Sequence, residues 1–219
     1  MTQSLRGDDS DGKLFMTKGL FITFEGSEGS GKSTQAKFVY DYLRKKGKKV
    51  MFIREPGGVK ISEAIRKILL DVKNTKMCDE TEALLYMAAR AQLVHDVIEP
   101  ALKSGKIILC DRFLDSTVCY QGYGNGVDID FIKTLGRFVT RGIQPHLTFI
   151  FDLDVQEGLR RRGSSRDRIE RRAVAYHNRV RNGYLKLAKQ EPRRIKVIKV
   201  NQSKEEIFKV VRKFIDWMI

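Results

Sequence analysis

Gly26-Ser27-Glu28-Gly29-Ser30-Gly31-Lys32-Ser33 is the stretch that decides the fold of this 219-residue chain. It matches the pattern G-x-x-x-x-G-K-[ST], follows an apolar run at residues 20–24 and opens a helical pattern at residues 32–45. Glycines let successive backbone N–H groups turn inward and, with a helix N-terminus, bind phosphate oxygens. The lysine of such a loop reaches the outer phosphates, and its hydroxyl can bind Mg²⁺. The sequence therefore predicts a phosphate-binding loop.

Apolar runs alternate with helical patterns along the rest of the chain. Runs that predict strands lie at residues 20–24, 50–53, 107–110, 147–151 and 195–200. Helical patterns lie at residues 32–45, 61–70, 81–102 and 203–217. The last helix would be capped by Ser203 and carry one apolar face: Ile207, Val210, Val211, Phe214 and Ile215. Continuously apolar strands, each followed by a helix, predict an α/β fold of the P-loop type, a three-layer fold with a parallel five-stranded sheet flanked by helices.

Composition bounds the domain organisation and the compartment. No stretch approaches the 18 apolar residues that a membrane span needs, which argues against a membrane span. No membrane partner is expected. Residues 1–18 carry three aspartates and no long apolar run, so we expect a disordered polar extension rather than a secretory signal. One domain is expected over residues 19–219. The three cysteines, Cys78, Cys110 and Cys119, are too few and scattered for a disulfide framework, which favours a cytoplasmic location.

The charge predicts a polyanionic partner. Lys and Arg number 42 and Asp and Glu 27, a net charge of +15, which suits nucleic acid, a membrane surface or phosphorylated small molecules. Residues 160–199 hold 15 of the cations and 3 of the acids, a net +12. This concentration argues against a broad nucleic-acid face. For Arg160–Arg162, Arg166 and Arg168 a solvated face and a role near phosphate both stay open, whereas solvated surface is expected for Arg179, Arg181, Arg193 and Arg194.

A phosphate-binding loop by itself permits several classes of protein, among them GTPases, motors, transporter ATPases and small kinases. The N-K-x-D pattern that reads guanine is absent from the sequence, and the chain is too short for a motor with appended domains. A small-molecule phosphotransferase is therefore the leading hypothesis.

Further motifs resemble those of the bacterial thymidylate kinase (dTMP kinase) family. The carrying segments, in chain order, are residues 24–34, Arg54-Glu55-Pro56-Gly57-Gly58, Tyr86-Met87-Ala88-Ala89-Arg90, Asp111-Arg112-Phe113, residues 116–122 and Asp167-Arg168-Ile169-Glu170. The likeness runs from about Gly19 to the C-terminus. It implies transfer of the γ-phosphoryl group of ATP to dTMP, giving dTDP and ADP, under a mobile lid at about residues 160–170.

The same resemblance implies how the two nucleotides are bound. The residues expected to contact ATP are Gly26, Ser27, Glu28, Gly29, Ser30, Gly31, Lys32, Ser33 and Thr34. The residues expected to contact dTMP are Glu28, Arg54, Glu55, Arg66, Tyr86, Arg90, Arg112, Thr117, Tyr120 and Gln121. Among these, Tyr86 would stack on thymine, Arg90, Thr117 and Gln121 would meet the base, and Tyr120 would crowd a 2′-hydroxyl.

Catalytic groups and partners are also implied by the resemblance. Ser33 and Asp111 would hold Mg²⁺, Asp111 being placed like a Walker-B acid at the end of an apolar strand. Some relatives carry an arginine where this chain has Gly29, so the catalytic arginine is expected from the lid: Arg161, Arg162 or Arg166. Lys32 and Arg112 would supply further positive charge. A homodimer is expected, and no nucleic-acid partner.

Three alternatives stay open on the sequence. One is another nucleoside monophosphate kinase or a deoxynucleoside kinase. The second is a P-loop ATPase whose basic surface binds nucleic acid, against which stands the lack of RNP-type aromatics or a helix-turn-helix. The third is an inactive scaffold, which the intact Gly31-Lys32-Ser33 and Asp111-Arg112 argue against.

Overall fold

The computed structural model describes residues 19–162 and 167–219. The expected extension at 1–18, and Arg166 with the middle of the expected lid, lie outside the described residues. The strands of the described part form one sheet: β1 (Leu20–Gly26), β2 (Val50–Arg54), β3 (Ile107–Asp111), β4 (Leu147–Asp152) and β5 (Ile195–Lys199). All neighbours are parallel, in the order β2-β3-β1-β4-β5. The predicted parallel five-stranded sheet is confirmed.

The helices occupy most of the remaining chain. They are α1 (Lys32–Lys45), α2 (Lys60–Leu70), α3 (Asp79–Leu93), α4 (Glu99–Lys103), α5 (Leu114–Thr117), α6 (Ile129–Val139), α7 (Val155–Arg162), α8 (Val174–Gln190) and α9 (Lys204–Met218), with π-helical segments η1 (Val94–Ile98) and η2 (Val118–Gly124). The uniform helix predicted over 81–102 is wrong: α3, η1 and α4 follow one another there. Pro100 lies just inside α4 and has no N–H to donate, which disfavours uninterrupted α-helical bonding across this stretch.

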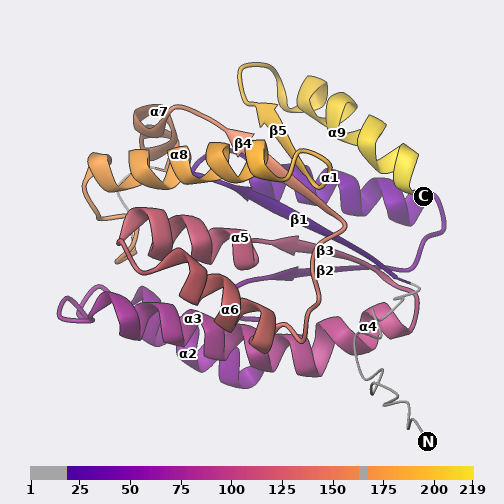
Figure 1. The fold of residues 1–219 in the computed structure, drawn as a ribbon. Coiled ribbons are helices and arrows are strands. Elements are labelled where there is room, and N and C mark those ends of the chain that lie inside the picture. Colours follow the sequence, from indigo (N-terminus) through magenta and orange to yellow (C-terminus); the bar gives the residue numbers. More distant parts are fainter. Residues whose placement is uncertain (1–18, 163–166) are drawn as a thin grey trace, which may run out of the picture.

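One face of the sheet is covered by α1 and α9, which lie beside each other (Figure 1). Ile22 and Phe24 of β1 point to this face because alternate side chains of a strand point the same way. The buried stripe of α9 is Ile207, Val211 and Ile215. Val210, predicted to share that face, is exposed, since it lies one residue off the four-residue spacing of the stripe.

The opposite face of the sheet is covered by the α3-η1-α4 run, η2, α6 and α8 (Figure 1). Helix α8 lies within the basic window, where no helix was predicted. Its buried residues recur at helical spacing: Tyr176, Val180, Tyr184 and Leu187. The sequence contains this period, but the arginines and lysines of the outer face lie between the apolar residues and mask it.

Of the four arginines expected to be solvated surface in this window, Arg179 and Arg193 are exposed as expected, whereas Arg181 and Arg194 are partly buried and are a second correction. Arg181 pairs with Asp152 at the end of β4 (Nε–Oδ1 2.6 Å). Arg194 pairs with Asp115 (Nη1–Oδ2 2.7 Å) and is largely buried. Arg179 donates to the carbonyl of Gly124 (Nη2–O 2.7 Å). Planar guanidinium groups suit such paired, partly buried positions, so much of the basic charge of this window is used inside the fold.

The topology gathers functional segments at one edge of the sheet. The carboxyl ends of parallel strands share an edge, and ligands of open α/β sheets bind there. The phosphate-binding loop follows β1, and Asp111 ends β3 beside it, with Phe24 and Asp111 as register partners. In the described part of the chain, no helix is long and apolar enough to cross a membrane.

Candidate active site

A pocket of about 510 Å³ opens at this edge, a size suited to small molecules. The predicted site residues that line it are Glu28, Gly29, Gly31, Lys32, Ser33, Thr34, Arg54, Glu55, Arg66, Tyr86, Arg90, Asp111, Arg112, Thr117, Tyr120, Gln121 and Arg161. Gly26, Ser27 and Ser30 do not line it, because they form the back of the loop. Topology thus brings together residues that are up to 133 positions apart, from Glu28 to Arg161.

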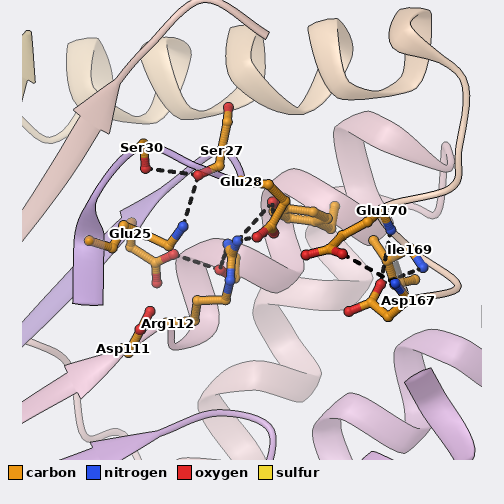
Figure 2. A network of polar contacts seen from close by, with 12 residues as sticks. Glu25, Ser27, Glu28, Ser30, Asp111, Arg112, Asp167, Ile169 and Glu170 are labelled. Atoms are coloured by element: carbon orange, nitrogen blue, oxygen red, sulfur yellow. Dashed lines mark hydrogen bonds and ion pairs between the residues drawn. The ribbon is translucent and has the colours of Figure 1, made fainter. Parts of the chain in front are cut away.

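The phosphate-binding loop is held by its own side chains. The Ser27 carbonyl accepts from the Ser30 hydroxyl and from Lys32 Nζ, each at 2.8 Å (Figure 2). Gly31 caps α1 in the left-handed region, at φ 82°. Burial, followed by the Arg112 charge, lowers the pKa of Lys32. A buried ammonium group is therefore aimed at the loop, where anionic oxygens would relieve the cost of its burial.

Gly29 has no room for a side chain. A Cβ at Gly29 would lie 2.2 Å from the carbonyl oxygen of Gly158, and one at Gly158 would lie 2.4 Å from the carbonyl oxygen of Glu28. The two glycines let α7 pack directly on the phosphate-binding loop. An arginine could not occupy position 29 without displacing α7, which explains physically why this loop carries none.

Ser33, at the start of α1, contacts Asp111, at the end of β3. Ser33 Oγ donates to Asp111 Oδ2 at 2.5 Å. A hydroxyl and a carboxylate are oxygen ligands of the kind that Mg²⁺ takes, and Mg²⁺ usually adds waters and substrate phosphates. No group of three or more His, Cys, Asp or Glu side chains among the described residues could hold a metal ion by itself. The pair therefore fits an ion that arrives with a bound phosphate.

Arg112 lines the pocket and connects several of its polar side chains. Its backbone has φ 71°, an uncommon conformation for a non-glycine residue. Its guanidinium donates to the Glu28 carboxylate (Figure 2), to the Tyr120 hydroxyl (3.0 Å) and to Ser116 Oγ (3.2 Å). The Glu28 charge inside a phosphate-binding loop is thereby neutralised. Arg112 lines the pocket, and a planar guanidinium group of this kind can bind a phosphate bidentately.

The buried Glu25 holds the residues around Arg112 in place. Its buried carboxylate accepts from the backbone N–H of Phe113 (2.7 Å), from Ser116 (2.6 Å) and from Tyr184 (2.8 Å). Ser116 and Tyr184 each also bond Arg112. Burial, and then the charge of Asp115, raises the pKa of Glu25 to about 7. Because its hydrogen bonds hold Phe113 and Ser116, Glu25 fixes the turn after β3 that carries Arg112.

The opposite end of the pocket is built around Arg90. Its Nε donates to Glu55 Oε2 at 2.8 Å, and its Nη2 donates to Thr117 Oγ1 at 3.0 Å. Arg90 and Glu55 are both buried, and burial raises the pKa of Glu55 against the lowering effect of Arg90. Tyr86 lines the pocket one helical turn before Arg90. An aromatic ring and a guanidinium group held in place by Glu55 and Thr117 thus line one space, which suits a polar aromatic base.

The loop after β2 brings two further cations to the pocket. Arg54 pairs with Glu63 (Nη2–Oε1 3.0 Å), not with Glu55, the neighbour that an isolated surface pair would use. Arg54 and Arg66 both donate to the Pro56 carbonyl, at 3.1 and 2.9 Å. One carbonyl thus holds two guanidinium groups that line the pocket.

Arg161 lines the pocket, whereas Arg166 and the side chain of Arg162 lie outside the part of the chain that the structure describes. The Nε of Arg161 donates to Glu157 Oε1 at 2.8 Å. Arg162 ends α7.

Seven lining residues were not among the predicted site residues: Pro56, Leu70, Phe113, Ser116, Asp167, Ile169 and Glu170. The turn at 167–170 carried a readable signal, since an acid three residues before a glutamate is a capping-box pattern. Asp167 Oδ1 accepts from the Glu170 N–H (2.9 Å), and Glu170 Oε2 accepts from the Asp167 N–H (3.2 Å) (Figure 2). Ser116 and Leu70 carried no local signal, because only packing brings them to the pocket.

Comparison with known proteins agrees with this geometry. A family model described as thymidylate kinase matches residues 24–211. A thymidylate kinase of Halothermothrix orenii is 51% identical over 199 residues, covering 89% of this chain and 95% of that protein. One of Symbiobacterium thermophilum is 46% identical, covering 90% and 92%. The crystal structure of the thymidylate kinase from Ehrlichia chaffeensis superposes with a TM-score of 0.75 at 33% identity, covering 90% of this chain and 98% of that one.

Proposed function

The chain belongs to the thymidylate kinase family, and from that premise we propose how its own residues carry out the reaction. The reaction is transfer of the γ-phosphoryl group of ATP to dTMP, which gives dTDP and ADP. The observation that carries the assignment of roles is one pocket with two unlike ends. Lys32 and the phosphate-binding loop form one end, Arg90 and Tyr86 form the other, and Arg112 lies between them.

In this proposal dTMP enters base first. Tyr86 stacks on the thymine ring, and the free N–H groups of Arg90 donate to its carbonyl edge. Glu55 holds the Arg90 fork in place through the 2.8 Å ion pair. Tyr120 lies against the sugar, and Glu28 meets the 3′-hydroxyl. The monophosphate then lies within reach of Arg112, Arg54 and Arg66.

Phosphoryl transfer needs positioning and charge neutralisation more than a strong base, because the nucleophile is an already ionised phosphate oxygen. The loop N–H groups and Lys32 hold the outer phosphates of ATP, and Arg112 holds the acceptor phosphate in line with them. Arg161 supplies charge from α7 as the phosphoryl group moves. Packing of α7 against the loop keeps water from the reacting phosphates.

We propose that Ser33 and Asp111 hold the Mg²⁺ that accompanies ATP. The ion held by these residues would supply positive charge against the phosphates of ATP. The hydrogen bond between Ser33 and Asp111 supports this role because it sets the two oxygen ligands side by side beside the loop.

A coupled assay of ADP release tests the reaction directly. dTMP should be turned over, and dCMP, UMP and thymidine should not. Preference for thymidine would identify a nucleoside kinase, and preference for UMP another monophosphate kinase. ATP hydrolysis stimulated by DNA or RNA, with salt-sensitive binding, would instead indicate the nucleic-acid-dependent ATPase.

Replacing Arg161 with alanine should lower kcat for dTMP about a hundredfold, because charge stabilisation of the transferring group is lost. Arg160→Ala is the matched control: Arg160 pairs with the same Glu157, but its side chain is 76% exposed. That variant should stay within twofold of the unmodified enzyme.

Single Arg162→Ala and Arg166→Ala variants complete the lid series. A large loss at either one, with Arg161→Ala mild, would move the role to that residue. Three mild effects would reject the lid arginine as a source of catalysis. The measurement is steady-state kcat at saturating ATP.

We further propose that the chain forms a homodimer through α2, α3 and α6. Exposed apolar side chains repeat on these neighbouring helices: Ile61, Ile68, Leu84, Phe131 and Phe138. Ile61 and Ile68 are seven residues apart, as are Phe131 and Phe138, so each pair shares a helix face. Apolar patches of this kind mark interaction surfaces.

Phe138→Glu is expected to convert the dimer to a monomer, since a charge would be buried without a partner. Trp217→Glu on α9 is the control, because Trp217 is as exposed (86%, against 79% for Phe138) but lies on the other face of the sheet. Light scattering should give twice 25.2 kDa for the control and 25.2 kDa for Phe138→Glu. A monomeric unmodified chain would refute the proposed interface.

We also propose a cytoplasmic location. Cys78, Cys110 and Cys119 are all free thiols, and Cys78 is exposed. An exposed free thiol is compatible with a reducing compartment. Cell fractionation would test the location.

A further inference from the structure

The buried Glu82 makes an unusual set of contacts just behind the base end of the pocket. Its side chain is fully enclosed, and it pairs with Arg168 (Oε2–Nη2 2.6 Å) and Arg172 (Oε2–Nη2 2.9 Å). Its other oxygen, Oε1, accepts from Gln121 Nε2 (2.9 Å) and Asn125 Nδ2 (3.0 Å). Held between two guanidinium groups, Glu82 is a carboxylate and can only accept hydrogen bonds. It does not itself line the pocket.

These contacts fix which way the Gln121 amide points. A side-chain amide has a donor end and an acceptor end of nearly the same shape, so its hydrogen-bond partners decide its orientation. A carboxylate on one side requires Nε2 to face Glu82. Gln121 is 1% exposed and lines the pocket, and no hydrogen bond within the described part of the chain occupies its Oε1. The atom that remains for the ligand is a carbonyl oxygen, an acceptor.

We infer that Glu82 is a positioning residue that sets the base specificity of the pocket, by locking Gln121 with its acceptor toward the ring N3 of the pyrimidine. The inference rests on the proposed binding of the base between Tyr86, Arg90 and Gln121. Thymine and uracil carry an N–H at N3, which suits an acceptor. Cytosine carries a lone pair there, which the Gln121 oxygen repels.

The test is Glu82→Gln, which keeps the shape of the side chain. The new amide can offer either end to Gln121, so both orientations of Gln121 become accessible. The dTMP-to-dCMP affinity ratio, measured from KM and from competitive inhibition by dCMP, should fall about tenfold or more. The reason is that Gln121 could then turn its NH2 group toward the pocket and donate to the N3 lone pair of cytosine, which its oxygen repels in the unmodified enzyme. The dTMP-to-dUMP ratio should not change, since both bases carry the N3 hydrogen.

Arg172→Met is the matched control. It removes one charge from the same cluster but leaves the Glu82–Gln121 bond, so it should lower thermal stability without changing the dTMP-to-dCMP ratio. A folded Glu82→Gln enzyme whose ratio stays within twofold of the unmodified enzyme would overturn the inference. So would an Arg172→Met ratio that falls equally.

A swapped variant keeps the test decisive if Glu82→Gln does not fold. Combining it with Gln121→Glu restores one carboxylate to the cluster and again presents only an acceptor to the pocket. Selectivity close to that of the unmodified enzyme would support the inference, and a lost ratio would overturn it. Failure of the unmodified enzyme to phosphorylate dTMP would count against the proposed function instead.

Discussion

Lys32→Ala is expected to lower kcat for dTMP phosphorylation about a thousandfold, which corresponds to roughly 4 kcal/mol of transition-state stabilisation. Lys32 is the buried cation of the phosphate-binding loop, with Nζ 2.8 Å from the Ser27 carbonyl. In the proposed mechanism its charge meets the outer phosphates of ATP, where charge changes most during transfer. Steady-state kinetics with dTMP and ATP measure the loss.

The fold should survive this substitution. The Ser27 carbonyl keeps the Ser30 hydroxyl as a donor at 2.8 Å, so the loop loses one internal bond and not both. Lys37→Ala is the control, because Lys37 lies on the exposed side of the same helix, α1. That variant should show unchanged kcat. Full activity in a folded Lys32→Ala enzyme would remove Lys32 from the mechanism.

Arg112→Ala should lower kcat/KM for dTMP by a similar factor, about a thousandfold, with little change in the KM for ATP. The substitution removes the fork expected to bind the acceptor phosphate. It also removes the ion pair between Arg112 and the Glu28 carboxylate, which in the proposed mechanism lies beside the phosphates. Arg112→Lys keeps the charge but loses the planar fork, so its loss should be smaller than that of Arg112→Ala.

Arg141→Ala controls for the backbone effect of the Arg112 substitution. Arg112 and Arg141 are the non-glycine residues of the described chain with positive φ, at 71° and 54°. Arg141 does not line the pocket. Its variant should keep full kcat/KM whatever it does to the melting temperature. Equal kinetic losses in both variants would show that backbone strain, and not phosphate binding, accounts for the Arg112 effect.

Much of the fold was predictable because its signals are local. The phosphate-binding loop is encoded in eight consecutive residues, and each buried strand is a continuous apolar run, so their residues identify them without any knowledge of distant contacts. Helix α6 (Ile129–Val139) and helix α8 were not predicted. In α8 the apolar period was masked by the arginines and lysines between Tyr176 and Leu187, whose stems and charges cover its outer face.

Site residues, too, could be predicted only where the sequence around them carries a local signal. Lys32, Asp111 and Arg112 could be predicted because each directly follows a strand or lies in the loop itself. Leu70 and Ser116 could not be assigned roles, because they reach the pocket only through packing. The expectation that Arg181 and Arg194 are solvated was wrong for the same reason: their partners Asp152 and Asp115 lie 29 and 79 residues away.

The sequence by itself determined a parallel α/β sheet, a phosphate cradle at the end of its first strand and membership of a nucleotide-binding family. Backbone geometry and helix dipoles encode these features, and both act over a few residues. Only the tertiary structure decided which charges are neutralised: Glu28 by Arg112, Glu55 by Arg90, and Glu82 by Arg168 and Arg172. Charge pairing depends on distances that the strand order creates, and composition records the charges but not their partners.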